Sequence, residues 1–254
     1  MYRIDLNCDA GESFGQYKLG SDAELFKHVT SANIACGYHA GDHNVISQTV
    51  KLASENQLAI GAHPGFQDLV GFGRREMQLS LDEIYNLVIY QLGAIKTMAE
   101  VQGMKLNHVK PHGALYNLAA KDRDVSFAIA KAVKSVDKNL ILYGLAGSEL
   151  CRAGEETGLQ VAHEVFADRT YQSDGTLTPR TMPNALISDA EEATKQIIQI
   201  VKEGKVRSIT GEEVSIQADT VCIHGDGPDA PTFASTVRRY LQNENIVIAK
   251  IGEE

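Results

Sequence analysis

The sequence has no excess of basic residues. Its 254 residues include 24 lysines and arginines against 33 aspartates and glutamates, which gives a formal net charge of −9. Nucleic acids and anionic membrane surfaces are bound by positively charged faces, so we expect neither as a partner. The simplest consequence of the negative charge is solubility.

Long apolar runs are also missing. No stretch approaches the roughly 20 apolar residues that are needed to span a bilayer. The opening residues MYRIDLNCD alternate like a strand, and no basic segment followed by an apolar one is found there. We therefore expect no signal peptide and a cytoplasmic protein.

Paired cysteines are absent as well. The chain has four widely spaced single cysteines, Cys8, Cys36, Cys151 and Cys222. No CxxC pair indicates zinc or redox chemistry, and four cysteines in a chain of this length do not form a disulfide framework. Cysteines within strand-like runs are expected to act as small buried apolar residues.

The chain does contain a regular alternation of short apolar runs and amphipathic helical runs. Seven runs are rich in Val, Ile and Leu, as expected for parallel strands covered on both faces. They are residues 3–8, 31–36, 59–63, 106–110, 140–143, 160–166 and 220–224, and a short last run covers 246–251. Repeated strand–helix units predict one parallel sheet, and seven or eight units favour a closed α/β barrel. We therefore predict a single barrel domain over residues 1–254.

Helical patterns follow most of these runs. They cover residues 43–55, 81–101, 122–136, 148–157, 189–203 and 231–243. Asp42 is a predicted helix cap, and Ser80 with Glu83 forms a predicted capping box. Residues 206–216 break the rhythm, and the sequence Thr-Gly-Glu-Glu at 210–213 predicts the turn of a hairpin.

Ionisable side chains gather where the predicted strands end. In parallel barrels the active site forms at the carboxyl ends of the strands, so these residues predict an active site at the barrel mouth. The candidate catalytic residues are Asp9, His39, His63, Lys110 and His112. The candidate substrate-binding residues are Asn7, Glu12, Arg74, Glu164, Arg169, Arg180, His224 and Asp226.

The sequence is consistent with several roles for Asp9. With His39 and His43, which are four residues apart at a helix start, it is a candidate ligand of a divalent metal. The metal-free alternative makes Asp9 a general base, with histidines and Lys110 polarising a carbonyl. Lys110 is either a Schiff-base lysine or, more simply, a fixed cation for a carboxylate or phosphate. A structural alternative is that Asp9 only caps the turn at Gly11.

Two loops near the predicted mouth bear on substrate binding. Residues 168–183 form a long connection of the kind that often acts as a lid, and Arg169 and Arg180 in it are candidate clamps for an anion. Residues 144–148, Gly-Leu-Ala-Gly-Ser, precede a predicted helix whose N-terminus could hold a phosphate. No Gly-Lys-Ser/Thr follows, so this is not a Walker sequence, and a simple turn is the better interpretation.

Taken together, these segments resemble one family. The segments are DLNCDAGESFG at 5–15, NIACGYHAGD at 33–42, GAHPG at 61–65 with GFGRR at 71–75, VKPHGALY at 109–116, EVFADR at 164–169 and CIHGD at 222–226. In this order they are similar to the motifs of the LamB/YcsF family, the A subunits of 5-oxoprolinase. The resemblance spans nearly the whole chain.

The resemblance implies a seven-stranded β/α barrel related to glycoside hydrolases and polysaccharide deacetylases. It implies hydrolysis of 5-oxoproline to L-glutamate coupled to ATP hydrolysis, together with subunits B and C. ATP is then a co-substrate, and a divalent cation is expected either with ATP or at the mouth. A homo-oligomer is compatible with the sequence. Two alternatives stay open: a stand-alone metal-dependent deacetylase-type hydrolase, and a non-catalytic binding subunit.

Overall fold

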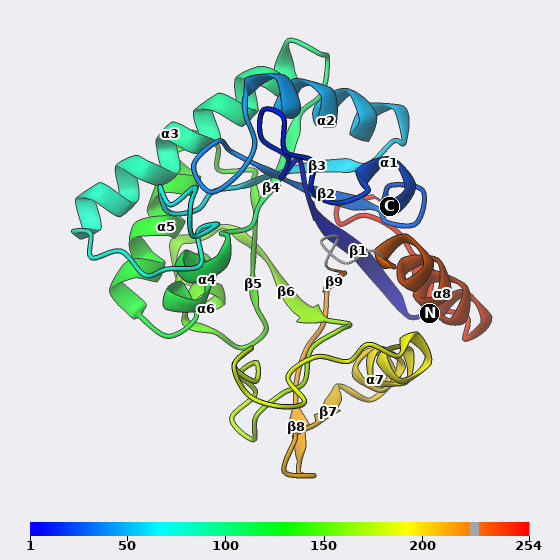
Figure 1. The fold of residues 1–254 in the computed structure, drawn as a ribbon. Helices are drawn as coiled ribbons and strands as arrows, with labels where there is room; N and C mark the ends of the chain where they lie inside the picture. Colours follow the sequence, from blue (N-terminus) through cyan, green and yellow to red (C-terminus); the bar gives the residue numbers. More distant parts are fainter. Residues whose placement is uncertain (224–228, 254) are drawn as a thin grey trace.

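Seven parallel strands close into a barrel in the computed structural model, which describes residues 1–223 and 229–253 (Figure 1). The ring consists of β1 (Arg3–Ala10), β2 (Ser31–Ala35), β3 (Ala59–His63), β4 (Leu106–Val109), β5 (Ile141–Leu145), β6 (Gln160–Phe166) and β9 (Thr220–Cys222). It closes because β9 pairs with both β6 and β1, with Thr220 opposite Glu164 on one side and Asp5 on the other. The predicted seven-stranded barrel is thus confirmed.

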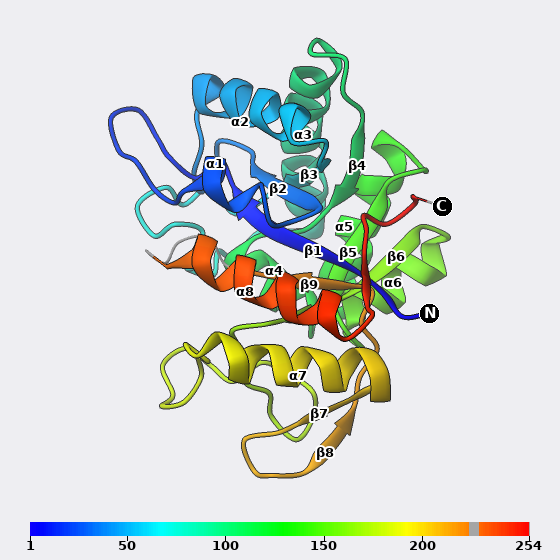
Figure 2. The ribbon, with the colours of Figure 1, turned by 90° about the vertical axis from the view of Figure 1, so that its right-hand side faces the viewer.

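Helices surround the ring and cover its outer face (Figures 1 and 2). They are α1 (Asp22–Leu25), α2 (His43–Glu55), α3 (Leu81–Glu100), α4 (Gly113–Ala119), α5 (Arg123–Val136), α6 (Glu149–Thr157), α7 (Ala190–Glu203) and α8 (Ala230–Asn243). The Asp42 cap and the capping box of Ser80 and Glu83 are confirmed. The sequence did not predict α1 and α4, because four and seven residues are too few to show a helical period. Among the described residues, no helix is long and apolar enough to cross a membrane.

Three further strands lie outside the ring in the described part of the chain. β7 (Lys205–Arg207) and β8 (Glu213–Ser215) form the predicted antiparallel hairpin. β10 (Val247–Ile248) pairs in parallel with the first residues of β1 and does not enter the ring. The predicted last ring strand, 220–224, is observed to Cys222, and its residue 224 lies outside the described residues.

The barrel interior is unusually polar near the middle of the strands. Asp5 accepts hydrogen bonds from the hydroxyls of Thr30, Ser31 and Thr220 at 2.5–2.7 Å. His108 lies beside Asn33, with 2.7 Å between its Nε2 and the amide oxygen. Burial raises the pKa of Asp5 and lowers that of His108 to about 3. Because the polar side chains satisfy one another, they can replace the apolar layers of a typical barrel.

Gly61 on β3 makes room for the His108 ring, and we predict that Gly61→Ala is strongly destabilising. A β-carbon at Gly61 would lie 2.1 Å from His108 Nε2. Either the ring or the strand must then move inside a packed barrel, at a cost of about 1–3 kcal/mol or more. Chemical denaturation would measure the free energy of unfolding.

Gly93 is the matched control for this substitution. It lies within α3, and an added β-carbon there meets no described atom within 4 Å. Gly93→Ala should therefore stabilise the protein by roughly 0.5–1 kcal/mol through helix propensity. Equal stability of the two alanine variants would contradict the proposed role of Gly61.

Candidate active site

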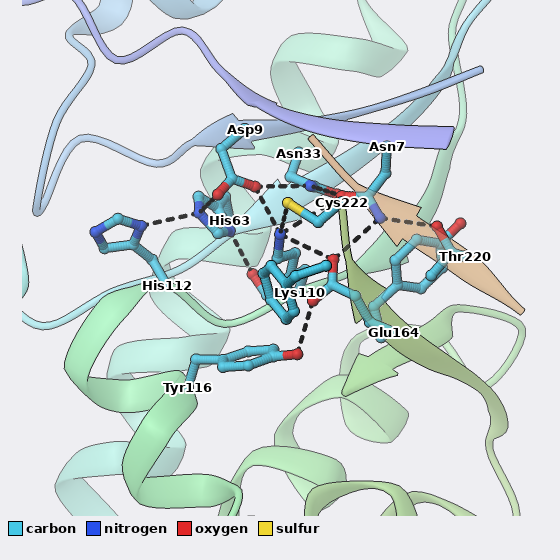
Figure 3. Close-up of polar contacts among 12 residues, drawn as sticks. Asn7, Asp9, Asn33, His63, Lys110, His112, Tyr116, Glu164, Thr220 and Cys222 are labelled. Carbon is cyan, nitrogen blue, oxygen red and sulfur yellow. Dashed lines mark hydrogen bonds and ion pairs between the residues drawn. The ribbon is translucent and has the colours of Figure 1, made fainter. Parts of the chain in front are cut away.

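Lys110 forms the centre of the barrel mouth. It follows β4, is buried, and its ammonium lies 2.8 Å from Asp9 Oδ1 and 2.9 Å from Glu164 Oε1 (Figure 3). Asp9 comes from β1 and Glu164 from β6, which do not pair with β4. The lysine therefore links carboxylates from the two strands that flank β9 in a charge-assisted network.

Neutral amides and hydroxyls orient the two carboxylates. Asn33 Nδ2 donates to Asp9 Oδ1 at 2.8 Å and to Asn7 Oδ1 at 2.7 Å. Asn7 Nδ2 in turn donates to Glu164 Oε1 at 3.0 Å, and the Tyr116 hydroxyl donates to Glu164 Oε2 at 2.7 Å. The carboxylate positions are therefore set by a connected network that restricts their rotation.

The charges at the mouth hold Lys110 protonated. Burial by itself would lower the pKa of Lys110, but neighbouring acidic groups, Asp9 foremost, outweigh burial and raise it well above its usual range. A Schiff-base lysine needs a lowered pKa. Of the two roles considered for Lys110, the geometry therefore favours the fixed cation.

Three histidines form a cluster beside Asp9. His63 Nε2 lies 3.4 Å from Asp9 Oδ2 and 2.9 Å from His112 Nδ1. The ring of His39 stacks on that of His112 with centroids 3.7 Å apart, and Glu12 Oε1 lies 3.6 Å from His39 Nε2. Burial lowers the pKa of His39 well below its usual value and that of His112 to about 3, so both rings are neutral at pH 7.

A cleft of about 530 Å³ lies next to the Lys110 network and the histidine cluster. Asp9, Glu12, His63, Lys110 and His112 line its base, and Tyr116, Leu145 and Phe166 contribute apolar walls. Arg74, Arg169 and Arg180 also line it. A volume of this size suits a small molecule, and the arginines make the entrance favourable for an anion.

The connection between β6 and α7 covers one side of the cleft. It contributes Thr176, Leu177, Pro179 and Thr181 to the lining. Arg169 holds this loop together, because its guanidinium donates to the carbonyls of Thr178 at 2.6 Å and Ala185 at 3.4 Å. Movement of the loop as a lid stays a prediction.

The structure gathers most of the predicted site residues. Those it brings to the mouth are Asn7, Asp9, Glu12, His39, His63, Arg74, Lys110, His112, Glu164, Arg169 and Arg180. His224 and Asp226 lie outside the described residues. Of the two adjacent arginines, Arg74 lines the cleft, whereas Arg75 pairs with Asp68.

Two geometric expectations need correction. His43 is exposed at the first residue of α2 and does not join His39, because the helix carries its side chain away from the mouth. The group that could hold a metal is instead Glu12, His39, His63 and His112. Asp9 Oδ2 lies 3.4 Å from His63 Nε2, and the Asp9 carboxylate is also near enough to His39 to act on its pKa, which it raises against the larger lowering by burial. The suggested cap of Gly11 by Asp9 is not found, since the Gly11 amide donates to Asp22.

Some residues of the site were not predicted. Asn33 and Tyr116 orient the carboxylates, and Cys222 places its sulfur 3.1 Å from the Lys110 ammonium. Side chains alternate between the two faces of a strand, and Asn33 and Cys222 stand at positions that point into the barrel. This alternation was the sequence feature that could have identified them. Tyr116 reaches the site from α4, a helix that the sequence did not predict.

Comparison with known proteins identifies relatives along the whole chain. Residues 4–254 match the LamB/YcsF family. The chain is 58% identical to the 5-oxoprolinase A component of Bacillus subtilis over 254 residues, covering 100% of this chain and 99% of the relative. It is also 58% identical to the corresponding 5-oxoprolinase component of Oceanobacillus iheyensis over 249 residues, covering 98% and 97%.

Solved structures agree with the barrel assignment. The lactam utilization protein from Thermus thermophilus is 47% identical, with a TM-score of 0.93 over 97% of this chain and 99% of that one. A family 4 carbohydrate esterase from Streptomyces lividans is 11% identical, with a TM-score of 0.51 over 99% and 93%. The second similarity shows a shared fold alone.

Proposed function

Because this chain belongs to the LamB/YcsF family, we propose that it is the A component of an ATP-dependent 5-oxoprolinase, which hydrolyses 5-oxo-L-proline to L-glutamate. The observation that carries the proposal at the site is the ammonium of Lys110 between Asp9 and Glu164 at the base of a small cleft. A binding subunit without chemistry has no need of buried charges, whose desolvation is costly.

The proposed reaction explains why such a site is needed. A five-membered lactam resists hydrolysis because its amide is resonance-stabilised. Transfer of the γ-phosphoryl group of ATP to the amide oxygen would give an imidate-like species. Water would then add to its carbon and the ring C–N bond would break, which gives γ-glutamyl phosphate. A second water molecule would hydrolyse this acyl phosphate to glutamate and phosphate. ATP and two water molecules would be consumed for each glutamate, ADP and phosphate formed.

The residues of the mouth suit the hydrolytic part of this scheme. Asp9 is the carboxylate placed to orient a water molecule and accept its proton. Lys110 would stabilise the negative charge that develops on oxygen. Arg74, Arg169 and Arg180, which line the cleft, would hold the substrate carboxylate or the phosphoryl group.

The wider assignment follows from the same proposal. ATP would act as co-substrate with Mg²⁺, subunits B and C would complete the enzyme, and the assembly would work in the cytoplasm, where ATP is available. The fold that this chain shares with a carbohydrate esterase gives one alternative candidate for its function. That candidate is a stand-alone metal-dependent deacetylase, supported at the site by the group of Glu12 and three histidines.

Reconstitution separates these functions. The purified chain alone is expected to release negligible glutamate from 5-oxoproline, and adding subunits B and C with ATP should give glutamate and ADP in equal amounts. Omitting ATP is the control and should stop the reaction. Robust glutamate release by the chain alone would contradict the proposal. ATP-independent acetate release from acetylated sugars would establish the deacetylase instead.

A further inference from the structure

The protonation pattern of His63 and His112 has a direct chemical consequence. His63 Nδ1 lies 2.7 Å from the carbonyl oxygen of Lys110, and His112 Nε2 lies 2.8 Å from that of Phe72. A carbonyl oxygen only accepts, so each of these nitrogens carries the ring proton. In the neutral form of an imidazole that donates through one nitrogen, the other nitrogen has a lone pair and no hydrogen.

Those two bare nitrogens face each other. His63 Nε2 and His112 Nδ1 are 2.9 Å apart, which is hydrogen-bond distance. Between two neutral imidazoles with these tautomers, two lone pairs would face each other and repel. The contact becomes favourable only when a positive charge lies at or beside it.

His39 gives a second, independent observation. Its side chain is 0% exposed, and neither of its ring nitrogens has a hydrogen-bond partner among the described residues. Buried polar atoms are nearly always satisfied, so a group that would bind them is expected. Glu12 Oε1 lies 3.6 Å from His39 Nε2 and 3.9 Å from His112 Nδ1 and adds a carboxylate to the same space.

We propose that Glu12, His39, His63 and His112 bind one divalent transition-metal ion, Zn²⁺ in the first place. The ligand atoms of these four residues all lie within 4.8 Å of one another. The ligands of a tetrahedral Zn²⁺ ion, each about 2.1 Å from it, are about 3.4 Å apart, so the most distant pair has to close by up to about 1.4 Å, shared between two side chains. Two nitrogens 2.9 Å apart subtend about 90° at such an ion, an angle that metal coordination allows.

The surroundings match those of known metal-binding histidines. Such histidines usually donate their second ring nitrogen to a carbonyl or carboxylate, which fixes the ring and directs the lone pair at the ion. The Lys110 and Phe72 carbonyls have this relation to His63 and His112. Three imidazoles and one carboxylate form a donor set that suits Zn²⁺ better than Mg²⁺ or Ca²⁺, which prefer oxygen ligands. The site differs from a set built on Asp9 and His43, because the exposed His43 does not belong to this group.

The test is direct binding of Zn²⁺ to the full chain. After treatment with a chelator, titration calorimetry with Zn²⁺ and elemental analysis after dialysis should both give about one equivalent per chain. His39→Ala and Glu12→Gln should each weaken Zn²⁺ binding by about 10- to 100-fold or more. His43→Ala is the matched control and should bind Zn²⁺ like the unchanged chain. Co²⁺ should give visible absorption bands of a four- or five-coordinate site in the unchanged chain, a readout that needs no variant to fold.

Two results would overturn the proposal. One is the absence of stoichiometric Zn²⁺ binding, together with ¹⁵N resonances that show an imidazolium shared between His63 and His112 at neutral pH. The other is Zn²⁺ binding that is lost in His43→Ala and kept in His39→Ala. The measurements need neither ATP, 5-oxoproline nor subunits B and C. A chain that binds Zn²⁺ but fails in reconstitution would therefore contradict the proposed function and leave this inference intact.

Discussion

Asp9→Asn is expected to reduce glutamate formation in the reconstituted enzyme by about a hundredfold or more, because an amide cannot accept a proton from water at neutral pH. The fold should survive this change. An asparagine oxygen can still accept from Lys110 and Asn33, whose nitrogens each lie 2.8 Å from Asp9 Oδ1. Its amide nitrogen would face His63 Nε2, which lies 3.4 Å from Asp9 Oδ2 and can accept a hydrogen bond. Steady-state turnover, thermal unfolding and assembly with the partner subunits would be measured together.

Asp124→Asn is the matched control, since Asp124 is exposed in the first turn of α5. It should keep full turnover. If Asp9→Asn assembles normally and also keeps near-normal turnover, then Asp9 is not the base. A normally assembled but inactive variant would exclude the non-catalytic binding subunit.

Lys110→Met is expected to have the largest effect on stability. It would leave the fully buried Glu164 without the ammonium that now lies 2.9 Å away, and would remove the same partner from Asp9. Breaking a buried ion pair by deleting one member typically costs about 3–5 kcal/mol. Urea denaturation at pH 7 should show a loss of this order in the free energy of unfolding. Turnover in the reconstituted enzyme should also be lost.

A double variant distinguishes charge from packing. In Lys110→Met with Glu164→Gln, one buried carboxylate is removed with its partner, so part of the lost stability should return. Lys131→Met, at an exposed position of α5, is the surface control and should cost little. If Lys110→Met were as stable as the unchanged chain, the ion-pair network would have no structural role.

Several parts of the fold could be predicted from the sequence. The predicted strands at 59–63 and 160–166 coincide with β3 and β6. All five residues of β3 are buried, as expected for a parallel strand covered on both faces. The Ser80 and Glu83 capping box marked the start of α3. Alternation of strands and helices was enough to predict the barrel. The carboxyl ends of its strands then indicated the mouth and most of its ionisable residues.

Contacts within the mouth could not be predicted in the same way. The sequence grouped Asp9 with His39 and His43, but it did not indicate that His63 Nε2 would lie 3.4 Å from Asp9 or that the His39 ring would stack on that of His112. His43 shares a helix start with His39 but is exposed. Of two adjacent arginines, only Arg74 faces the cleft, while Arg75 pairs with Asp68.

The sequence by itself determined the order of the ring strands and the longer helices, the closed barrel and most of the ionisable residues at its mouth, because these depend on local periodicity and on the common direction of parallel strands. The tertiary structure alone decided which of those residues meet. Lys110 lies between Asp9 and Glu164, and His39, His63 and His112 converge with Glu12. These contacts join residues from different strands and loops. Their distances depend on barrel closure and loop geometry, which no local pattern encodes.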